Sequence, residues 1–375
     1  MIKKSYRQLL ASMVMLLMVL SCNRDNTITE NNDTNPSVTG KGDLITLKSG
    51  VQVLLKDGQY YLSDDIILNK AQLESLDKYG DLVPANSSPL SADHTTHPAT
   101  GMPLSLTQGN KAVGQYPTSY NMWAMVRYVY GPSLSTVQKD IMRLAIEHWE
   151  ANSNIRFYNA TGMPTVDPTY GFAYPYIEFV NGGNTNSSQI GRNANGGRQE
   201  LKIQTASFVY SGVVGAAIHE LGHAIGLDHE HNSFDRDNYV NLNLNNVLPE
   251  KRFNFNKRTS NYYNIGSVDF QSVMIYDSQA FASSPNLIVM TKKSDGSTFT
   301  GNDVTSSTDR QWANSFYIPY IARSDVYREL ATTVYKTDNT VMTPQERLQF
   351  QAQLNNGNPN PPAGGRIPND HSRYQ

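Results

Sequence analysis

Cysteine is nearly absent from this 375-residue chain, and so is any imbalance of charge. The only cysteine is Cys22, which excludes a disulfide within the chain. Lys and Arg number 31 against 33 Asp and Glu, and charged residues make up only 17% of the sequence. A chain this balanced carries no broad electrostatic footprint for nucleic acids or anionic lipids. We therefore expect no nucleic-acid partner, and membrane contact only through a lipid anchor.

A hydrophobic run long enough to cross a bilayer is missing as well. The apolar run near the N-terminus covers residues 9–20, whereas a membrane-spanning helix takes about 20 residues. It follows Lys3, Lys4 and Arg7, an arrangement typical of a signal peptide. The run ends in Val19-Leu20-Ser21-Cys22, which resembles the lipobox of bacterial lipoproteins. We expect a signal peptide at 1–21 and lipidation of Cys22; an ordinary signal peptide with an incidental Cys22 is the alternative.

The composition divides the rest of the chain into three parts. Residues 22–112 begin with a polar stretch, continue with short apolar runs and end in a linker rich in Pro, Ser, Thr and Gly. They are expected to form a tether and a pro-segment. An activating protease is expected to cut between about 86 and 114. Residues 113–320 are expected to form the main domain. In the extension, 321–375, Thr343 to Glu346 is a capping box that opens one helix, and a Pro-, Gly- and Asn-rich tail from Asn355 is expected to be disordered.

The periodicity of the main domain predicts an α+β fold. Residues 135–152 have apolar side chains at helical spacing, and a second helix is expected from about 213 to 226. Alternating apolar residues predict strands at 155–158, 176–180 and 201–205. An extended substrate would pair with an edge strand, for which we take residues 191–205.

The second helix carries a metal-binding pattern. His219 and His223 lie one turn apart on the same face, the spacing that zinc needs from two nitrogen ligands. Gly226 lets the chain turn, so that His229 can return as the third ligand. The fourth position then stays open for water, which is typical of catalytic zinc. Glu220 lies between the first two ligands, where it can act as general base.

The sequence around this pattern resembles the astacin family of zinc metallopeptidases, of the metzincin clan. The resemblance includes residues 219–231 and 235–240, the strand that follows the first helix, and Ser272 to Tyr276, and it covers about 115–320. It implies one zinc ion per chain and a metzincin-like catalytic domain, with a twisted mixed sheet and two long helices above a loop-rich lower subdomain. The paired cysteines of animal members are missing, and Ile275 stands where a histidine is common.

The family resemblance also implies roles that spacing alone does not give. Met274 would form a hydrophobic floor under the metal. Tyr276 would be an additional zinc ligand that swings away and donates a hydrogen bond to the oxyanion. Glu230 would reach the new N-terminus of the mature enzyme.

The pro-segment carries a possible inhibitory motif. Residues 62–67 resemble the inhibitory stretch of the family, in which an aspartate occupies the position of the zinc-bound water. Asp65 aligns with this aspartate, although Asp64 replaces the usual glycine. A plain exposed acidic turn is the alternative.

Together these features predict a zinc-dependent endopeptidase that is made as a bacterial lipoprotein-type zymogen. The precursor would be exported and lipid-anchored at the outer membrane or cell surface, then released by an activating protease to cleave proteins or peptides. A zinc-containing surface lipoprotein that binds peptides without turnover is the alternative, although binding alone needs no Glu220. The other histidines are expected to be solvated: His94, His97, His148 and His371.

Overall fold

A computed structural model describes residues 42–82, 113–115, 122–258, 262–264 and 266–374. The predicted signal peptide, Cys22, most of the linker, His94 and His97 lie outside these residues. Within the described parts of the chain, no helix has both the length and the apolar character needed to cross a membrane.

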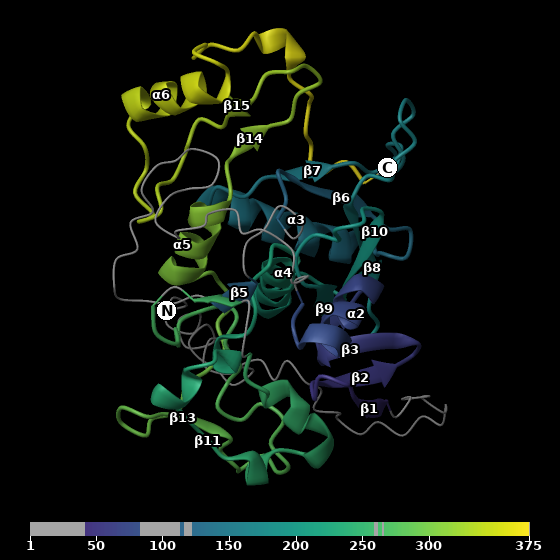
Figure 1. Cartoon of the computed structure of the whole chain (residues 1–375), viewed down its shortest axis with the longest axis vertical. Coiled ribbons are helices and arrows are strands. Elements are labelled where there is room, and N and C mark those ends of the chain that lie inside the picture. The colour runs from purple at the N-terminus through teal and green to yellow at the C-terminus, as the bar shows by residue number, and fades with distance from the viewer. Residues whose placement is uncertain (1–41, 83–112, 116–121, 259–261, 265, 375) are drawn as a thin grey trace, which may run out of the picture.

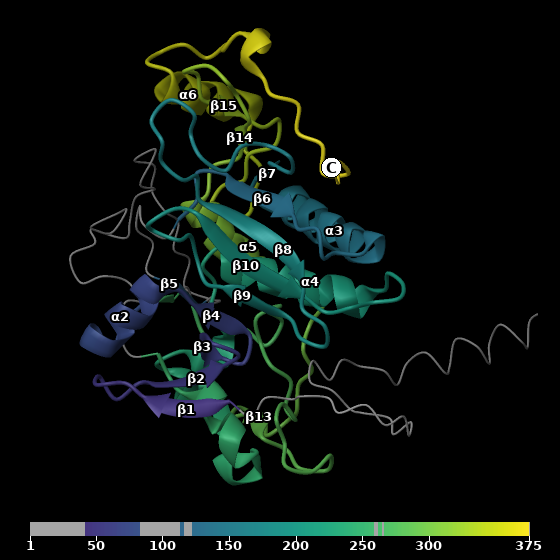
Figure 2. The same ribbon diagram turned by 90° about the vertical axis from the view of Figure 1, so that its right-hand side faces the viewer.

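The central element is a nine-stranded mixed sheet with the strand order β1-β2-β3-β4-β9-β10-β8-β6-β7 (Figures 1 and 2). Five strands come from the main domain: β6 (Val126–Tyr130), β7 (Phe157–Asn159), β8 (Tyr176–Asn181), β9 (Ser187–Gln189) and β10 (Arg198–Ile203). Strand β8 runs parallel to β6 and β10, whereas β9 is antiparallel to β10.

Two long helices pack against each other beside this sheet, α3 (Thr136–Asn152) and α4 (Ser211–Ala224) (Figure 1). Helix α3 begins after Ser135, whose side chain accepts a hydrogen bond from Gln138 N–H in a capping box. The indole N–H of fully buried Trp149 donates to the carbonyl of Ile218 at 3.0 Å and so joins the two helices. The predicted α+β class, with a large mixed sheet and two long helices, is confirmed.

The part of the chain after α4 is poor in regular structure, as predicted. Between α4 and α5 (Ser307–Phe316), the described residues form four 3₁₀ helices and short strands, and their core is a separate apolar cluster. The 3₁₀ helices are η1 (Glu230–Asn232), η2 (Arg236–Asn238), η3 (Leu244–Asn246) and η4 (Pro249–Phe255). The strands form two pairs, β11 (Val240–Leu242) with β13 (Met290–Lys292) and β12 (Tyr262–Asn264) with β5 (Val113–Gln115).

The predicted pro-segment extends the main sheet. It consists of β1 (Asp43–Thr46), β2 (Gln52–Lys56), β3 (Gln59–Ser63), β4 (Ile66–Leu68) and α2 (Lys70–Tyr79). Strand β4 pairs in parallel with β9, where Ile66 lies opposite Ser188. The prediction that residues 191–205 form the edge is therefore wrong, because β10 lies between β8 and β9. The edge of the main-domain sheet is β9, and β4 covers it.

The C-terminal extension is folded and packs against the main domain. After α5 (Ser307–Phe316) come β14 (Tyr320–Ile321), β15 (Glu329–Leu330), α6 (Pro344–Leu354) and η5 (Ala363–Gly365). Thr343 caps α6, as predicted. The prediction of a disordered tail from Asn355 is wrong: the side-chain amide of Asn159 donates to the carbonyls of Asp370 and Arg373, both at 2.7 Å.

Two histidines expected to be solvated also have protein partners. His371 Nδ1 lies 2.8 Å from the hydroxyl oxygen of Tyr128, and His148 Nε2 lies 2.9 Å from that of Thr305. The tail has too few apolar residues for a core of its own, but its polar groups pair with those of β6, β7 and α3. Composition does not reveal partners so distant in sequence.

Candidate metal centre and active site

Helix α4 and the turn after it bring three imidazoles together. His219 and His223 lie on one face of α4, which ends at Ala224. Gly226 then has a φ of 113°, a value that favours glycine, and the chain reverses. This turn brings His229 back against the helix. All three imidazoles are buried.

The Nε2 atoms of these histidines face a common point. His219 Nε2 and His229 Nε2 are 3.3 Å apart. On the other side of the rings, His219 Nδ1 lies 2.7 Å from the carbonyl oxygen of Val273, and His223 Nδ1 lies 2.9 Å from that of Leu227. Both Nδ1 atoms therefore carry the proton and donate it to a carbonyl, which leaves Nε2 with its lone pair toward the common point.

These donors fit a zinc ion. One nitrogen from each histidine and one oxygen of Asp65 all lie within 4.8 Å of one another. The buried Nε2 of His223 has no hydrogen-bond partner among the described residues. Burial, helped by the nearby His229, lowers the pKa of His223 to about 4 and keeps its imidazole in the neutral form that binds metals. Three nitrogens and one oxygen are donors that zinc commonly takes in proteins.

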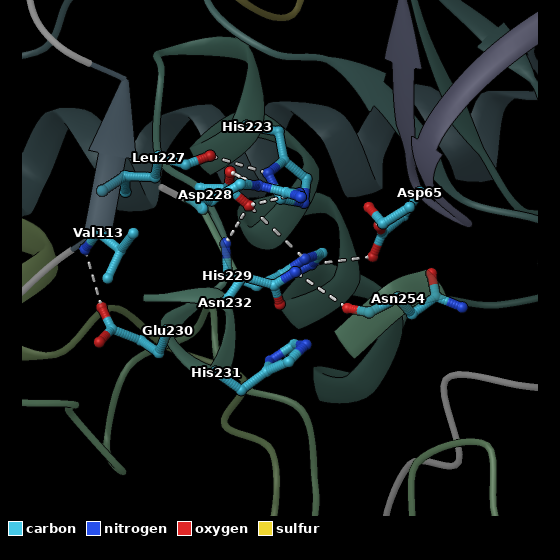
Figure 3. A network of polar contacts seen from close by, with 12 residues as sticks. Asp65, Val113, His223, Leu227, Asp228, His229, Glu230, His231, Asn232 and Asn254 are labelled. Atoms are coloured by element: carbon cyan, nitrogen blue, oxygen red, sulfur yellow. Dashed lines mark hydrogen bonds and ion pairs between the residues drawn. The ribbon is translucent and has the colours of Figure 1, made fainter. Parts of the chain in front are cut away.

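Asp65 of the predicted pro-segment points into this centre (Figure 3). Its Oδ2 atom lies 3.1 Å from His229 Nε2 and 3.6 Å from His219 Nε2. Burial alone would raise the pKa of Asp65, but the neighbouring imidazoles, His229 above all, outweigh burial and hold that pKa well below its usual range. Asp65 is therefore an ionised group in the centre and not an exposed acid.

The other predicted residues surround the three imidazoles. Glu220 is buried on α4 between the first two histidines. The hydroxyl of Tyr276 donates to Asp65 Oδ2 at 3.1 Å. Met274 is fully buried beneath α4, so close that a Cβ on Gly222 would lie 2.6 Å from its sulfur.

Glu230 lies on the side of the centre away from Asp65 (Figure 3). Its two carboxyl oxygens accept the backbone N–H groups of Val113 and Asp269, each at 3.1 Å. Burial raises the pKa of Glu230 well above its usual value, and the hydrogen bonds from the two backbone amides do not offset this effect of burial. The carboxyl group thus sits where the predicted main domain begins.

Two ion pairs at this site have no signal in the sequence patterns. Lys251 of η4 pairs with Asp64, which directly precedes Asp65. Asp228, directly before the third histidine, accepts the His229 N–H at 2.7 Å and pairs with Arg258 at 2.8 Å between Arg258 Nε and Asp228 Oδ2. Only the unusual position of an acid next to a metal ligand could have drawn attention to Asp228.

Replacing Arg258 with Met is expected to destabilise the fold by about 3–5 kcal/mol, because it leaves the buried carboxylate of Asp228 without its cation. The free energy of unfolding in urea measures this loss. Lys70→Met is the matched control, since Lys70 forms an exposed pair with Glu74 one helical turn away that contributes about 0.3–0.5 kcal/mol. Equal effects of the two substitutions would contradict a structural role for the buried pair.

Comparison with known proteins gives a consistent result over the main domain. The family model described as Astacin, a peptidase family, matches residues 115–318, close to the predicted 115–320. High choriolytic enzyme 2 of Oryzias latipes is 32% identical over 162 residues, which are 43% of this chain and 52% of that protein. Zinc metalloproteinase nas-12 of Caenorhabditis elegans is 30% identical over 205 residues, 52% of this chain and 49% of that protein.

A solved structure of the hatching enzyme zinc-protease high choriolytic enzyme 1 from Oryzias latipes is also similar. It is 28% identical with a TM-score of 0.43, and the match covers 51% of this chain and 88% of that one. The chain spans about half the length of the two curated relatives above.

Proposed function

The chain belongs to the astacin family of peptidases, and we propose from this premise that it is a zinc-dependent endopeptidase made as a self-inhibited precursor. One observation carries the proposal: three buried imidazoles direct Nε2 atoms at one point, and a carboxylate of the pro-segment occupies the remaining side. An intact Glu220 beside this point favours turnover over the alternative, peptide binding alone.

In the proposed reaction, His219, His223 and His229 would hold zinc, which when bound would polarise the substrate carbonyl and lower the pKa of water. Glu220 takes the proton of the attacking water and later gives it to the leaving amine. Once Asp65 has left, the hydroxyl of Tyr276 can donate a hydrogen bond to the oxyanion instead. Met274 packs under α4 against Gly222, which lies between the first two histidines.

Latency follows from two contacts of the pro-segment. Asp65 fills the fourth position, and β4 occupies the β9 edge, where an extended substrate would pair. A cut between about 86 and 114, followed by loss of the pro-segment, would remove both. The new N-terminal ammonium would then lie near Glu230, which already accepts the N–H of Val113.

We propose further that the precursor is exported and lipid-anchored through Cys22 at a bacterial outer membrane or cell surface, and that processing releases the enzyme. Membrane fractionation of the full chain beside Cys22→Ala tests this. A lipid anchor at Cys22 predicts that the full chain sediments with membranes and that the variant does not. Equal distribution of the two proteins would contradict the anchor.

Removal of the metal tests the proposed function. A chelator is expected to abolish cleavage of a quenched peptide by the processed chain, and one equivalent of zinc is expected to restore it, because three imidazoles alone offer no Lewis acid. Circular dichroism checks that the chelated protein stays folded. A folded, zinc-loaded and processed chain without activity would support the peptide-binding alternative.

A further inference from the structure

The carboxylate of Asp309, a residue outside the predicted site, contacts the backbone that supports the metal centre. Asp309 is the third residue of α5 and is fully buried. As part of a capping box it accepts the backbone N–H of Ser306 at 2.8 Å. This contact alone would explain an acid at the start of a helix.

Asp309 makes two more contacts that helix capping does not require. Its Oδ1 accepts the hydroxyl of Ser272 at 2.6 Å, and its Oδ2 accepts the backbone N–H of Val273 at 2.9 Å. The same Ser272 oxygen accepts the N–H of Met274 at 2.9 Å. Asp309 therefore anchors the backbone of residues 272–274.

That backbone in turn orients the metal centre. The carbonyl of Val273 lies 2.7 Å from His219 Nδ1, and the carbonyl of Met274 accepts the N–H of Glu230 at 3.2 Å, next to His229. The first of these contacts fixes both the tautomer and the ring angle of His219. A tilt of the Val273 peptide would turn the His219 ring away from the common point of the three Nε2 atoms.

We propose that Asp309 is a positioning residue of the zinc site, which acts through the Val273 peptide on His219. The inference rests on the proposed zinc-dependent function. Partners of metal-bound histidines typically change metal affinity by about 10–100-fold when they are lost. Asp309 is one step further out, but its two oxygens accept three donors from buried groups, so its removal leaves the Ser272–Val273 turn without an anchor.

Zinc affinity of the full chain, measured by competition with a chromophoric chelator, tests the proposal. Asp309→Ala is expected to bind zinc about 10–100-fold more weakly than wild type. Asp309→Asn is expected to fall between the two: its carbonyl oxygen can still accept the backbone N–H groups, and its amide can donate to Ser272. If the alanine variant does not fold, the zinc affinity of Asp309→Asn still tests the proposal.

Ser306→Ala is the matched control. It removes the N-cap oxygen of α5, which accepts the N–H groups of Thr308 and Asp309, but leaves the contacts of Asp309 with Ser272 and Val273 in place. It is expected to lower the melting temperature while zinc affinity stays at the wild-type value. A merely structural role for Asp309 predicts the same pattern for the Asp309 variants, and folded Asp309 variants with wild-type zinc affinity would overturn the proposal. Failure of the wild-type chain itself to bind zinc would instead overturn the proposed function.

Discussion

Replacing Glu220 with Gln is expected to lower kcat for peptide cleavage by about 10²–10⁴-fold. The amide has nearly the shape of the carboxylate but cannot take a proton from water. Glu220 is buried on α4 between His219 and His223, so no solvent-exposed base can replace it there. The rate is measured on a quenched peptide with processed protein.

The zinc content of the variant must equal that of wild type for this comparison, because Glu220 is not expected to be a ligand. Glu147→Gln on the exposed side of α3 is the matched control and is expected to leave kcat unchanged. A zinc-loaded Glu220→Gln variant with wild-type kcat would remove Glu220 from the proposed chemistry.

Replacing Asp65 with Ala is expected to give the unprocessed chain about 10–100-fold more peptidase activity than the unprocessed wild type. The carboxylate contacts His229 and the hydroxyl of Tyr276. Loss of one charged hydrogen bond costs about 1.5–3 kcal/mol. This energy shifts the equilibrium between the covered and the open cleft toward the open cleft by about 10–100-fold. The gain is partial, since β4 still covers β9.

Activity is measured with a short peptide, and gel analysis confirms that the chain stays uncut. Asp77→Ala is the control, because Asp77 lies on α2 of the same pro-segment and pairs only with Lys48 among the described residues. The switch role of Asp65 would be contradicted if both variants were as inactive as the unprocessed wild type while binding zinc normally.

The local features of this protein could be predicted from the sequence. The helical spacing of His219 and His223 is fixed by the geometry of α4, and Gly226 indeed has a positive φ. Capping boxes at Ser135 and Thr343 begin helices α3 and α6, where short-range patterns predict helix starts. Each of these features depends on residues a few positions apart.

Features that depend on distant partners could not be predicted. Strand β10 has the alternation of a strand, but alternation does not say which neighbour lies on each side; β9 and β8 lie on its two sides. The tail from Asn355 has few apolar residues, yet it is held by polar groups such as the amide of Asn159, which lies far earlier in the chain.

The long-range contacts around the centre could not be predicted either. Asp309 lies far in sequence from Ser272 and Val273, and its capping box with Ser306 does not indicate this contact. Arg258 lies far from Asp228 and stands in no recognisable motif. Only the folded chain shows that they support His219 and His229.

The most direct test of the central claim is to identify the products when an unfolded protein is mixed with the full zinc-loaded chain, before and after limited proteolysis ahead of Val113. Mass spectrometry of the products locates each cut. The account predicts internal fragments after removal of the pro-segment, few before it, and none when a chelator is present. An unfolded protein that stays intact in the presence of the folded, processed and zinc-loaded chain would contradict it.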